Sequence, residues 1–478
     1  MKYTFFIFDN IKSLMSGNAL IYDMSEEDIE DKIQKNLAIK EEEKNQFGEV
    51  FTPISLINEM LDELEHFNKD IFSNPNLTWL DPANGIGNFP IVIYKRLMKG
   101  LETRFKDKKK RHDHIIKNML YMIEINPKNV KISKKIFGTD ANICCGDFLS
   151  DKCFEGMNFD VIIGNPPYNE NGTGKGGGVF WKEFVFKSFD ILNKNGYLTF
   201  IHPTGWRKPI GERASAGDVW NIFKKNNLIF LKMSDKKIPN FPRVDYYVLQ
   251  KSTKQTNTKI INKFENHIFD GKIHLYELPF IPHFVNEEVL SILHKVISKS
   301  GDKFNILYNQ SFKPNKEDIK KSGIPHTFYY DPSIKDYLLV YKNYKGTIPE
   351  YINENKIIMT HTNGKKKGYL YPKYYSNEMG STRNTMYQLI NREDNIESIL
   401  ILLNSNLINF ILKITQYSES PNHKNEFKIL NMISKPNDKI LKTEKDVYKY
   451  YELNQKEINL IEVFMKDIKQ LIRPAYHL

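Results

Sequence analysis

Cysteine is scarce in this chain of 478 residues. Its three cysteines, Cys144, Cys145 and Cys153, form no C-x-x-C pair, and no pair of histidines stands near them at metal-ligand spacing. This pattern argues against a disulfide-rich secreted scaffold and against a zinc site. We therefore expect the protein inside a cell, with no metal.

Long hydrophobic runs are also lacking. The opening "MKYTFFIFDN" has a short apolar run that Asp9 breaks, which is too short for the core of a signal peptide. The most apolar later stretch, residues 398–414, is interrupted by Asn404, Asn406 and Asn409. A buried amphipathic helix is favoured there over a membrane span, so we expect no membrane partner.

Acidic residues are outnumbered by basic ones, 58 to 69, which gives a formal net charge of +11. An excess of this kind favours a polyanionic partner such as nucleic acid, although a solvated lysine-rich surface would give the same balance. With 40% hydrophobic residues, the chain can bury a large core and has the length of two or three domains.

Apolar strand-like runs alternate with amphipathic helix-like stretches in the first half of the chain. This alternation predicts an α/β fold with a doubly wound, Rossmann-like sheet whose core is largely parallel. After about residue 300, tyrosines, lysines and Gly/Asn turns predict a mixed α+β region. The expected divisions are a lead-in at 1–45, a main domain at 46–255, a connecting segment at 256–300 and a C-terminal domain at 301–478.

Polar residues close several of the predicted strands, where ligands bind in folds of this class. Asp81 ends one strand, and Gly85 and Gly87 follow it before a helix-like segment. Such glycines let a backbone approach a ligand closely. Glu124 closes the next strand and suits the two hydroxyls of a ribose. A third strand end carries Asp147 beside an aromatic ring, which suits an adenine. Together they fit one nucleoside, although each alone could be a helix cap or a turn.

The stretch "DVIIGNPPYNENG" ends a further strand with Asn165, two prolines and Tyr168. Proline fixes its own backbone and restricts the preceding residue, so Asn165-Pro166-Pro167 is a stiff corner. The Asn165 side-chain oxygen and the Pro166 carbonyl are two acceptors that suit an amino group. Their fixed positions favour the pyramidal amine that forms as a methyl group arrives. Tyr168 offers a face on which a planar base can stack.

These motifs, in this order, resemble the S-adenosylmethionine-dependent adenine-N6 DNA methyltransferases of bacterial restriction–modification systems and of some viruses. The stretches that carry the resemblance are "FGEVFTPISLINEML", "DPANGIGNF", "IEINP", "GDF", "NPPY" and "GYLTFIHPTGWR". The cofactor motif precedes NPPY, and only the C-terminal part has room for target recognition. That layout is similar to the gamma class.

The resemblance implies a methyltransferase catalytic domain at 46–255 and a target-recognition domain at 301–478. It implies S-adenosylmethionine as cofactor and, as acceptor, the N6 amine of an adenine flipped out of double-stranded DNA. It further implies a cytoplasmic protein, bacterial or viral within a host cell. A separate restriction endonuclease is one expected partner, and a monomer is favoured while the oligomeric state stays open.

The resemblance also assigns roles to individual residues. The residues expected in catalysis are Asn165, Pro166, Pro167 and Tyr168. The residues expected to bind the cofactor are Thr52, Pro53, Asp81, Pro82, Gly85, Gly87, Glu124, Asp147 and Phe148. The residues expected to contact the target base or DNA are Phe180, Phe184, Lys365, Lys366, Arg383 and Asn384, of which the last four could equally belong to solvated hairpins.

The chain departs from the family pattern at Asn84 and Ile86, where a small Cys and Ser are frequent. No cysteine lies in or beside the NPPY motif, which argues against cytosine-C5 chemistry. Two alternatives remain open. One is a methyltransferase acting on an RNA base or a protein glutamine, and the other is a catalytically silent DNA-binding specificity subunit.

Overall fold

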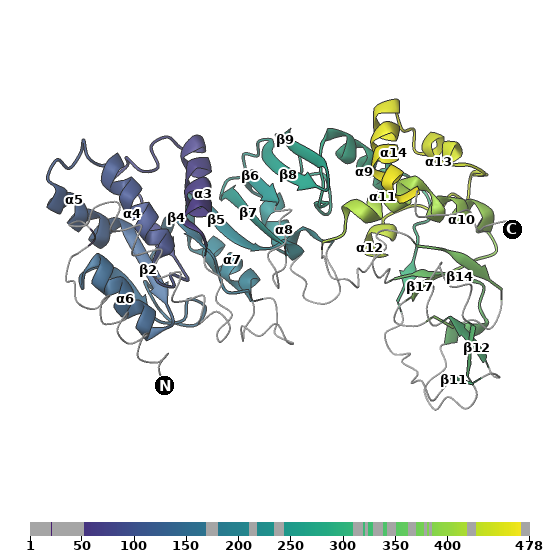
Figure 1. The fold of residues 1–478 in the computed structure, drawn as a ribbon, viewed down its shortest axis with the longest axis horizontal. Helices are drawn as coiled ribbons and strands as arrows, with labels where there is room; N and C mark the ends of the chain where they lie inside the picture. The colour runs from purple at the N-terminus through teal and green to yellow at the C-terminus, as the bar shows by residue number, and fades with distance from the viewer. Residues whose placement is uncertain are drawn as a thin grey trace, which may run out of the picture. The chain divides into compact units, whose positions relative to one another are not determined.

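The computed structural model describes residues 21, 52–168, 180–209, 218–233, 243–308, 319–320, 324–327, 338–341, 350–361, 370–376, 380–381, 385–417 and 427–469. The predicted lead-in at 1–45 therefore lies outside the described residues apart from Ile21. The chain divides into two compact units (Figure 1). Unit 1 comprises Met1–Trp206, Asp218–Met233 and Val244–Ile260, and unit 2 comprises Arg207–Gly217, Ser234–Arg243 and Ile261–Leu478.

Strands β1 to β7 of one nine-stranded sheet lie in unit 1, and the α/β prediction is confirmed. The strand order is β3-β2-β1-β4-β5-β7-β6-β8-β9. The strands are β1 (Trp79–Asp81), β2 (Leu120–Glu124), β3 (Asn142–Cys145), β4 (Phe159–Gly164), β5 (Leu192–Pro203), β6 (Asn227–Met233), β7 (Val244–Gln250), β8 (Thr258–Phe264) and β9 (His267–Ile273). The division between the units falls within β8.

The first five strands form the parallel core that the sequence predicts. Strand β1 pairs in parallel with both β2 and β4, β2 pairs in parallel with β3, and β4 pairs in parallel with β5. From β1 the chain builds the sheet outward to β3 and then returns to the other side of β1 with β4. In folds of this class, ligands bind beside the strand ends at such a reversal of strand order. Strand β7 then runs antiparallel to both β5 and β6.

Helices cover this sheet, as Figure 1 shows for α4 and α6 beside β2 and β4. Helix α3 contacts α4 and β7, α6 contacts β2 and β3, and α7 contacts β5. The helical elements are α3 (Ile54–Phe67), α4 (Asn88–Gly100), α5 (Lys108–His114), η2 (Ile115–Met119), α6 (Pro127–Phe137), α7 (Trp181–Asp190), η3 (Thr204–Arg207) and α8 (Asp218–Lys224).

Local sequence explains where α6, the helix that follows β2, begins. The side chain of Asn126 accepts a hydrogen bond from the Lys128 N–H, and Pro127 occupies the first helical position of α6. Both residues suit a helix start, because the asparagine oxygen caps a free N–H and proline has no N–H to satisfy. The turn after Glu124 is thus fixed by the residues that follow it.

Unit 2 contains two four-stranded sheets and a group of helices, which agrees with the mixed α+β prediction. The sheets have the orders β10-β17-β14-β15 and β11-β13-β12-β16. Their strands are β10 (Ile306–Leu307), β11 (Ile319–Lys320), β12 (Ile324–Thr327), β13 (Leu338–Tyr341), β14 (Lys356–Thr360), β15 (Lys373–Tyr375), β16 (Gly380–Ser381) and β17 (Thr385–Leu389). The helical elements are α9 (Glu287–Ser298), η5 (Glu350–Asn353), α10 (Ile396–Asn404), α11 (Asn406–Ile414), α12 (Phe427–Leu430), α13 (Glu444–Tyr450) and α14 (Gln455–Lys469).

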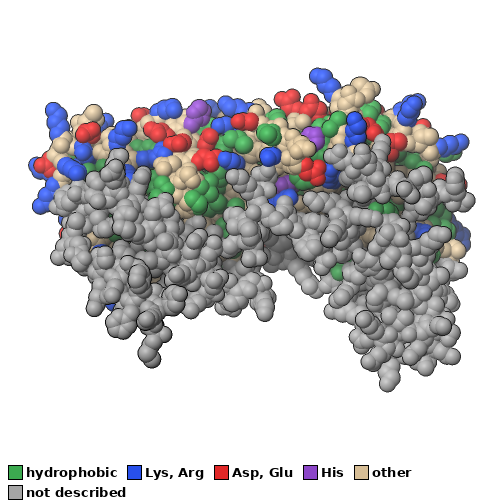
Figure 2. Space-filling model, viewed as in Figure 1, with side chains coloured by type: hydrophobic (Ala, Val, Ile, Leu, Met, Phe, Trp, Pro, Cys, Tyr) green, Lys and Arg blue, Asp and Glu red, His purple; other side chains and the backbone are tan. Residues whose placement is uncertain are grey.

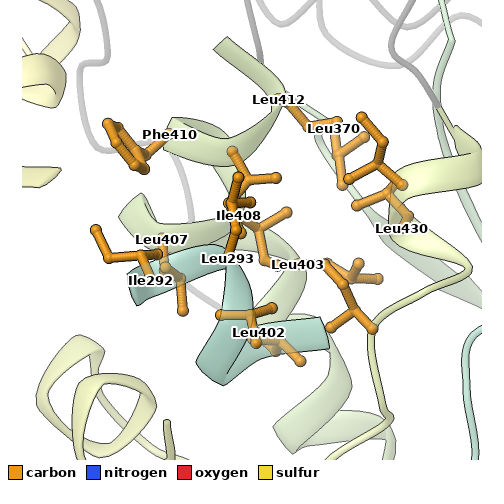
Figure 3. Packing of buried hydrophobic residues seen from close by; sticks show 14 of the residues in the cluster. Ile292, Leu293, Leu370, Leu402, Leu403, Leu407, Ile408, Phe410, Leu412 and Leu430 are labelled. Atoms are coloured by element: carbon orange, nitrogen blue, oxygen red, sulfur yellow. The ribbon is translucent and has the colours of Figure 1, made fainter. Parts of the chain in front are cut away.

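The predicted connecting segment at 256–300 forms β8, β9 and α9, and α9 packs into the core of unit 2. Figure 3 shows Ile292 and Leu293 of α9 beside Leu402, Leu403 and Leu407 of the two apolar helices.

The apolar stretch at 398–414 forms two buried helices, α10 and α11. Ser405 separates them, and its hydroxyl accepts a hydrogen bond from the Ile408 N–H and so caps α11. Within the described ranges, no single helix is long and apolar enough to cross a membrane. Helices α10 and α11 reach that length and apolarity only when taken together, and a bend of 48° separates them.

Charges of both signs are mixed over the described surface that Figure 2 shows, without a large patch of one sign. Several form ion pairs, such as Arg96 with Asp62 at 2.6 Å and Lys117 with Asp140 at 3.2 Å. The described charges on this face are therefore not gathered into one basic patch.

We predict that Gly100→Ala destabilises unit 1, although alanine normally stabilises a helix by roughly 1 kcal/mol relative to glycine. A Cβ at Gly100 would lie 2.3 Å from the carbonyl oxygen of Phe72. Because a backbone atom cannot move aside cheaply, overpacking should lower the free energy of unfolding by about 1–3 kcal/mol. Urea denaturation followed by tryptophan fluorescence measures this change. Lys99→Ala, an exposed neighbour on the same helix, is the control with little effect, and an unchanged or raised stability of Gly100→Ala would contradict the packing.

Candidate cofactor and base-binding site

Four neighbouring parallel strands end at one edge of the sheet of unit 1. In sheet order these ends are Cys145 on β3, Glu124 on β2, Asp81 on β1 and Gly164 on β4. Adjacent strands lie about 4.8 Å apart, so the four ends span roughly 15 Å. The predicted nucleoside residues and the NPPY motif thus lie along one line.

Asp81 occupies the end of β1 and is 1% exposed. Its Oδ1 accepts a hydrogen bond from the Ala83 N–H at 3.1 Å, and its buried Oδ2 has no hydrogen-bond partner among the described residues. Burial raises the pKa of Asp81 to about 8, the Ala83 N–H lowers it, and the negative charge of Glu124 raises it. A Cβ at Gly164 would stand 2.8 Å from Oδ1, so the end of β4 needs glycine at this position.

The loop after Asp81 begins with buried Pro82 and has two glycines in the left-handed region, Gly85 with φ 59° and Gly87 with φ 97°. No heavy atom lies within 4 Å of the position that a Cβ on Gly85 would take, so the backbone is open there. Asn84, one of the departures from the family pattern, donates its Nδ2 to Ser133 Oγ at 2.8 Å. This contact ties the loop to α6.

Glu124 is buried at the end of β2 and its carboxylate is held by the chain. Oε2 accepts from the Gly85 N–H at 2.7 Å, and Oε1 accepts from the Asn126 N–H at 2.8 Å and from Asn129 Nδ2 at 3.3 Å. The same carboxylate therefore links the β2 end to the glycine loop and stays oriented toward this edge.

Ile125, directly after Glu124, is 68% exposed. Sequence reasoning missed it as a site residue. A large apolar side chain in solvent beside a ligand edge offers a surface for a planar ring. The available signal was an isoleucine at the first position outside the strand, between two polar residues.

At the third strand end, Asp147 is held inside its own loop. Its Oδ1 accepts from the Leu149 N–H at 2.9 Å, its Oδ2 accepts from Ser150 Oγ at 2.8 Å, and its N–H donates to Asp151 Oδ2 at 2.7 Å. Phe148 is only 3% exposed, and its ring lies 5.2 Å from that of Phe184. The ring of Phe148 is thus packed inside unit 1.

A disulfide joins Cys144 and Cys153, whose Cα atoms lie 6.0 Å apart, and it encloses the loop that carries Asp147. The sequence analysis did not predict this pairing. Cys145, the last residue of β3, is free and exposed.

The NPPY residues meet Thr52, which lies 113 positions earlier in the chain. Asn165 Nδ2 donates to Thr52 Oγ1 at 3.1 Å, and Thr52 is buried. Burial raises the pKa of the Tyr168 phenol, and a hydrogen bond from the Asn165 amide lowers it. Because the amide nitrogen donates to these two oxygens, the amide oxygen is left as the end that can accept.

Two more predicted residues lie close by. The Phe180 N–H donates to the Tyr168 carbonyl at 3.3 Å, and the Phe180 ring lies 5.7 Å from that of Phe184. The structure therefore brings Phe180 next to Tyr168, while Phe184 is buried against Phe148.

The remaining predicted residues are placed as follows. Pro53 is exposed and starts α3, where its carbonyl accepts from the Leu56 and Ile57 N–H groups. Pro166 is buried and Pro167 exposed. Lys365, Lys366, Arg383 and Asn384 lie outside the described residues. Within the described ranges, no group of His, Cys, Asp and Glu residues is arranged to hold a metal ion.

Comparison with known proteins agrees with this geometry. Residues 18–231 match the family described as Eco57I restriction-modification methylase. The chain is 29% identical to an uncharacterized adenine-specific methylase of Mycoplasma pneumoniae (strain ATCC 29342 / M129 / Subtype 1), over 33% of this chain and 55% of that protein. It is 27% identical to the modification methylase CviBIII of Paramecium bursaria Chlorella virus NC1A, over 35% of this chain and 40% of that protein. The chain thus spans about half the length of these curated relatives.

Among solved structures, the Type IIL restriction-modification enzyme MmeI in complex with DNA shares the fold with a TM-score of 0.50 and 12% identity. The similarity covers 91% of this chain and 77% of that chain. At this identity it bears on the fold alone. Over residues 18–231, the chain is similar to the Eco57I restriction-modification methylase family.

Proposed function

We propose that the chain transfers a methyl group from S-adenosylmethionine to the N6 amine of an adenine flipped out of double-stranded DNA. The observation that carries this proposal is the order of the four strand ends. Asp147, Glu124, Asp81 and Asn165 follow one another from β3 to β2, β1 and β4. In the same order, S-adenosylmethionine has adenine, ribose and sulfonium, and the methyl acceptor comes next.

The residues of this edge fit such a cofactor. Asp147 and exposed Ile125 would hold the adenine, Glu124 the ribose hydroxyls, and the open backbone at Gly85 would leave room for the ligand. Asp81 has a buried oxygen without a hydrogen-bond partner among the described residues, which suits a positively charged group. When bound, the cofactor supplies an electrophilic methyl group.

The chain's own residues would then hold the acceptor. The Asn165 oxygen and the Pro166 carbonyl accept hydrogen bonds from the two protons of the amine, and this favours a lone pair on nitrogen over one delocalised into the ring. Tyr168 stacks on the base and offsets part of the few kcal/mol that flipping costs, with a contribution of about 1–3 kcal/mol. The name of one curated relative, an adenine-specific methylase, supports adenine as the target base.

Transfer of a labelled methyl group tests this function directly. The chain is incubated with methyl-labelled S-adenosylmethionine and, in parallel, with unmethylated DNA, RNA or a protein mixture. We expect label in DNA, and long-read sequencing should place N6-methyladenine at one sequence context. Label in RNA or protein alone would replace the proposal by the alternative acceptors, and binding of DNA without any transfer would favour a silent specificity subunit.

We predict that Asn165→Ala lowers the single-turnover rate of methyl transfer by about 10²–10³-fold, because it removes one of the two acceptors for the amine. Binding of S-adenosylmethionine, measured by calorimetry, should change little. Asn118→Ala, a substitution of an exposed asparagine in unit 1, is the matched control and should retain the full rate. A normal single-turnover rate in Asn165→Ala would remove Asn165 from the mechanism.

We predict that Thr52→Val slows transfer by about tenfold, the effect of one hydrogen bond of roughly 1.4 kcal/mol. Valine has the size of threonine but cannot accept the Asn165 amide proton, so the amide loses a contact that orients its oxygen. Thr52→Ser keeps the hydroxyl and should keep most of the rate. If Thr52→Val instead weakens cofactor binding at an unchanged rate, Thr52 acts on the cofactor and not on Asn165.

A further inference from the structure

Among the described residues of the site edge, Asp81 is the acidic side chain with a buried oxygen that lacks a hydrogen-bond partner. Glu124 accepts from two backbone N–H groups and the Asn129 amide. Asp81 is as buried as the core of the sheet, at 1% exposed, and receives a hydrogen bond only on Oδ1. Its Oδ2 has no hydrogen-bond partner in the described part of the chain. A buried carboxyl in this state needs a proton or a cation.

The described groups that face Asp81 include no cation. On β2 the nearby charged group is Glu124, which is itself negative. On β4 the facing residue is Gly164, which has no side chain, and the loop after β1 contributes the Ala83 N–H. Among the described residues, no cation acts on the titration of Asp81. A ligand is therefore the natural source of the positive charge.

We propose that Asp81 makes this site selective for a ligand with positive charge at the end of β1, and that it binds such a ligand as a carboxylate after releasing its proton. This inference rests on the proposed function. With the cofactor bound in the order of the strand ends, its sulfonium would lie between the ribose at Glu124 and the amine at Asn165, at the position of Asp81. After methyl transfer, the sulfonium becomes a neutral thioether, so the site would bind the substrate form more tightly than the product form.

Charge and proton balance give the sign of the pH dependence. With burial raising the pKa of Asp81 to about 8, most free protein at pH 7 holds a neutral carboxylic acid. Binding a cation then moves one proton from Asp81 to the buffer, and this step costs affinity below the pKa. The affinity for a cationic ligand should therefore rise about tenfold between pH 7 and pH 9 and then level off.

Calorimetry with three ligands tests the inference without any methyl transfer. S-adenosylmethionine has a sulfonium, sinefungin has an ammonium at the corresponding position, and S-adenosylhomocysteine has a neutral thioether. All three share the amino acid group, so its own titration cancels in the ratio of affinities. At pH 7, in two buffers of different ionisation enthalpy, we expect release of close to one proton for each of the first two ligands. For S-adenosylhomocysteine we expect almost none.

Asp81→Asn mimics the protonated side chain and cannot become a carboxylate, so it shows what the charged form of Asp81 contributes to binding. This variant should bind S-adenosylmethionine about tenfold or more weakly at pH 9 and bind S-adenosylhomocysteine with nearly the original affinity. The ratio of the two affinities should no longer depend on pH. Asp140→Asn, a substitution of an exposed aspartate in unit 1, is the control that should behave like the original protein. If Asp81→Asn does not fold, the proton release measured with the original protein still tests the inference.

The outcomes distinguish this inference from the proposed function. Equal proton release with all three ligands, or an affinity ratio that does not change with pH, would overturn the role of Asp81 while leaving cofactor binding intact. Failure of all three ligands to bind would overturn both. A pH-dependent ratio that persists in Asp81→Asn would assign the proton to another group and contradict the inference.

Discussion

The whole site depends on one constraint of the sheet, namely that β1 has a parallel neighbour on each side. Since β2 and β4 both run alongside β1, their carboxyl ends meet at one edge, and the chain leaves that edge in two directions. The end of β1 therefore lies between the ends of β2 and β4. Asp81 lies there, and β4 approaches it so closely that only a glycine, Gly164, fits.

The polar groups along this edge fall into two kinds. Glu124, Asp147 and Asn165 are oriented by hydrogen bonds within the chain, so their positions are set before any ligand arrives. Such fixed groups cost little reorganisation when a ligand binds. Asp81 is the opposite case, because its burial is offset only in part by the Ala83 N–H. The fold thus orients the first three side chains, and in our proposal a cationic ligand balances the charge of Asp81.

Much of this arrangement could be predicted from the sequence because it depends on local signals. Strand ends at Asp81, Glu124 and Gly164 follow from apolar runs that stop at polar or proline residues. The stretch 88–100, read as a helix after Gly87, is α4. These features need only short-range periodicity and the backbone preferences of Gly and Pro.

Other features depend on contacts between distant residues, which periodicity does not encode. The sequence analysis did not identify β6, whose neighbour β7 lies between it and β5 in the sheet. It treated 398–414 as one helix, whereas Ser405 both ends α10 and caps α11. It also placed Thr52 beside the cofactor, without its contact to Asn165 across 113 positions.

Ile125 and the Cys144–Cys153 disulfide were missed for the same reason. Exposure and pairing are properties of the folded chain. The sequence alone does not determine whether an isoleucine after a strand is exposed, or whether two cysteines nine positions apart form a disulfide.

We propose that the ligand lies along the strand ends in the order β3, β2, β1 and β4. A crystal structure of the chain with sinefungin bound tests this order. We expect adenine beside Ile125 and Asp147, the ribose hydroxyls on Glu124, and the ligand's ammonium within hydrogen-bond distance of Asp81 Oδ2. A ligand that runs in the reverse direction, or that leaves Asp81 without contact, would contradict it.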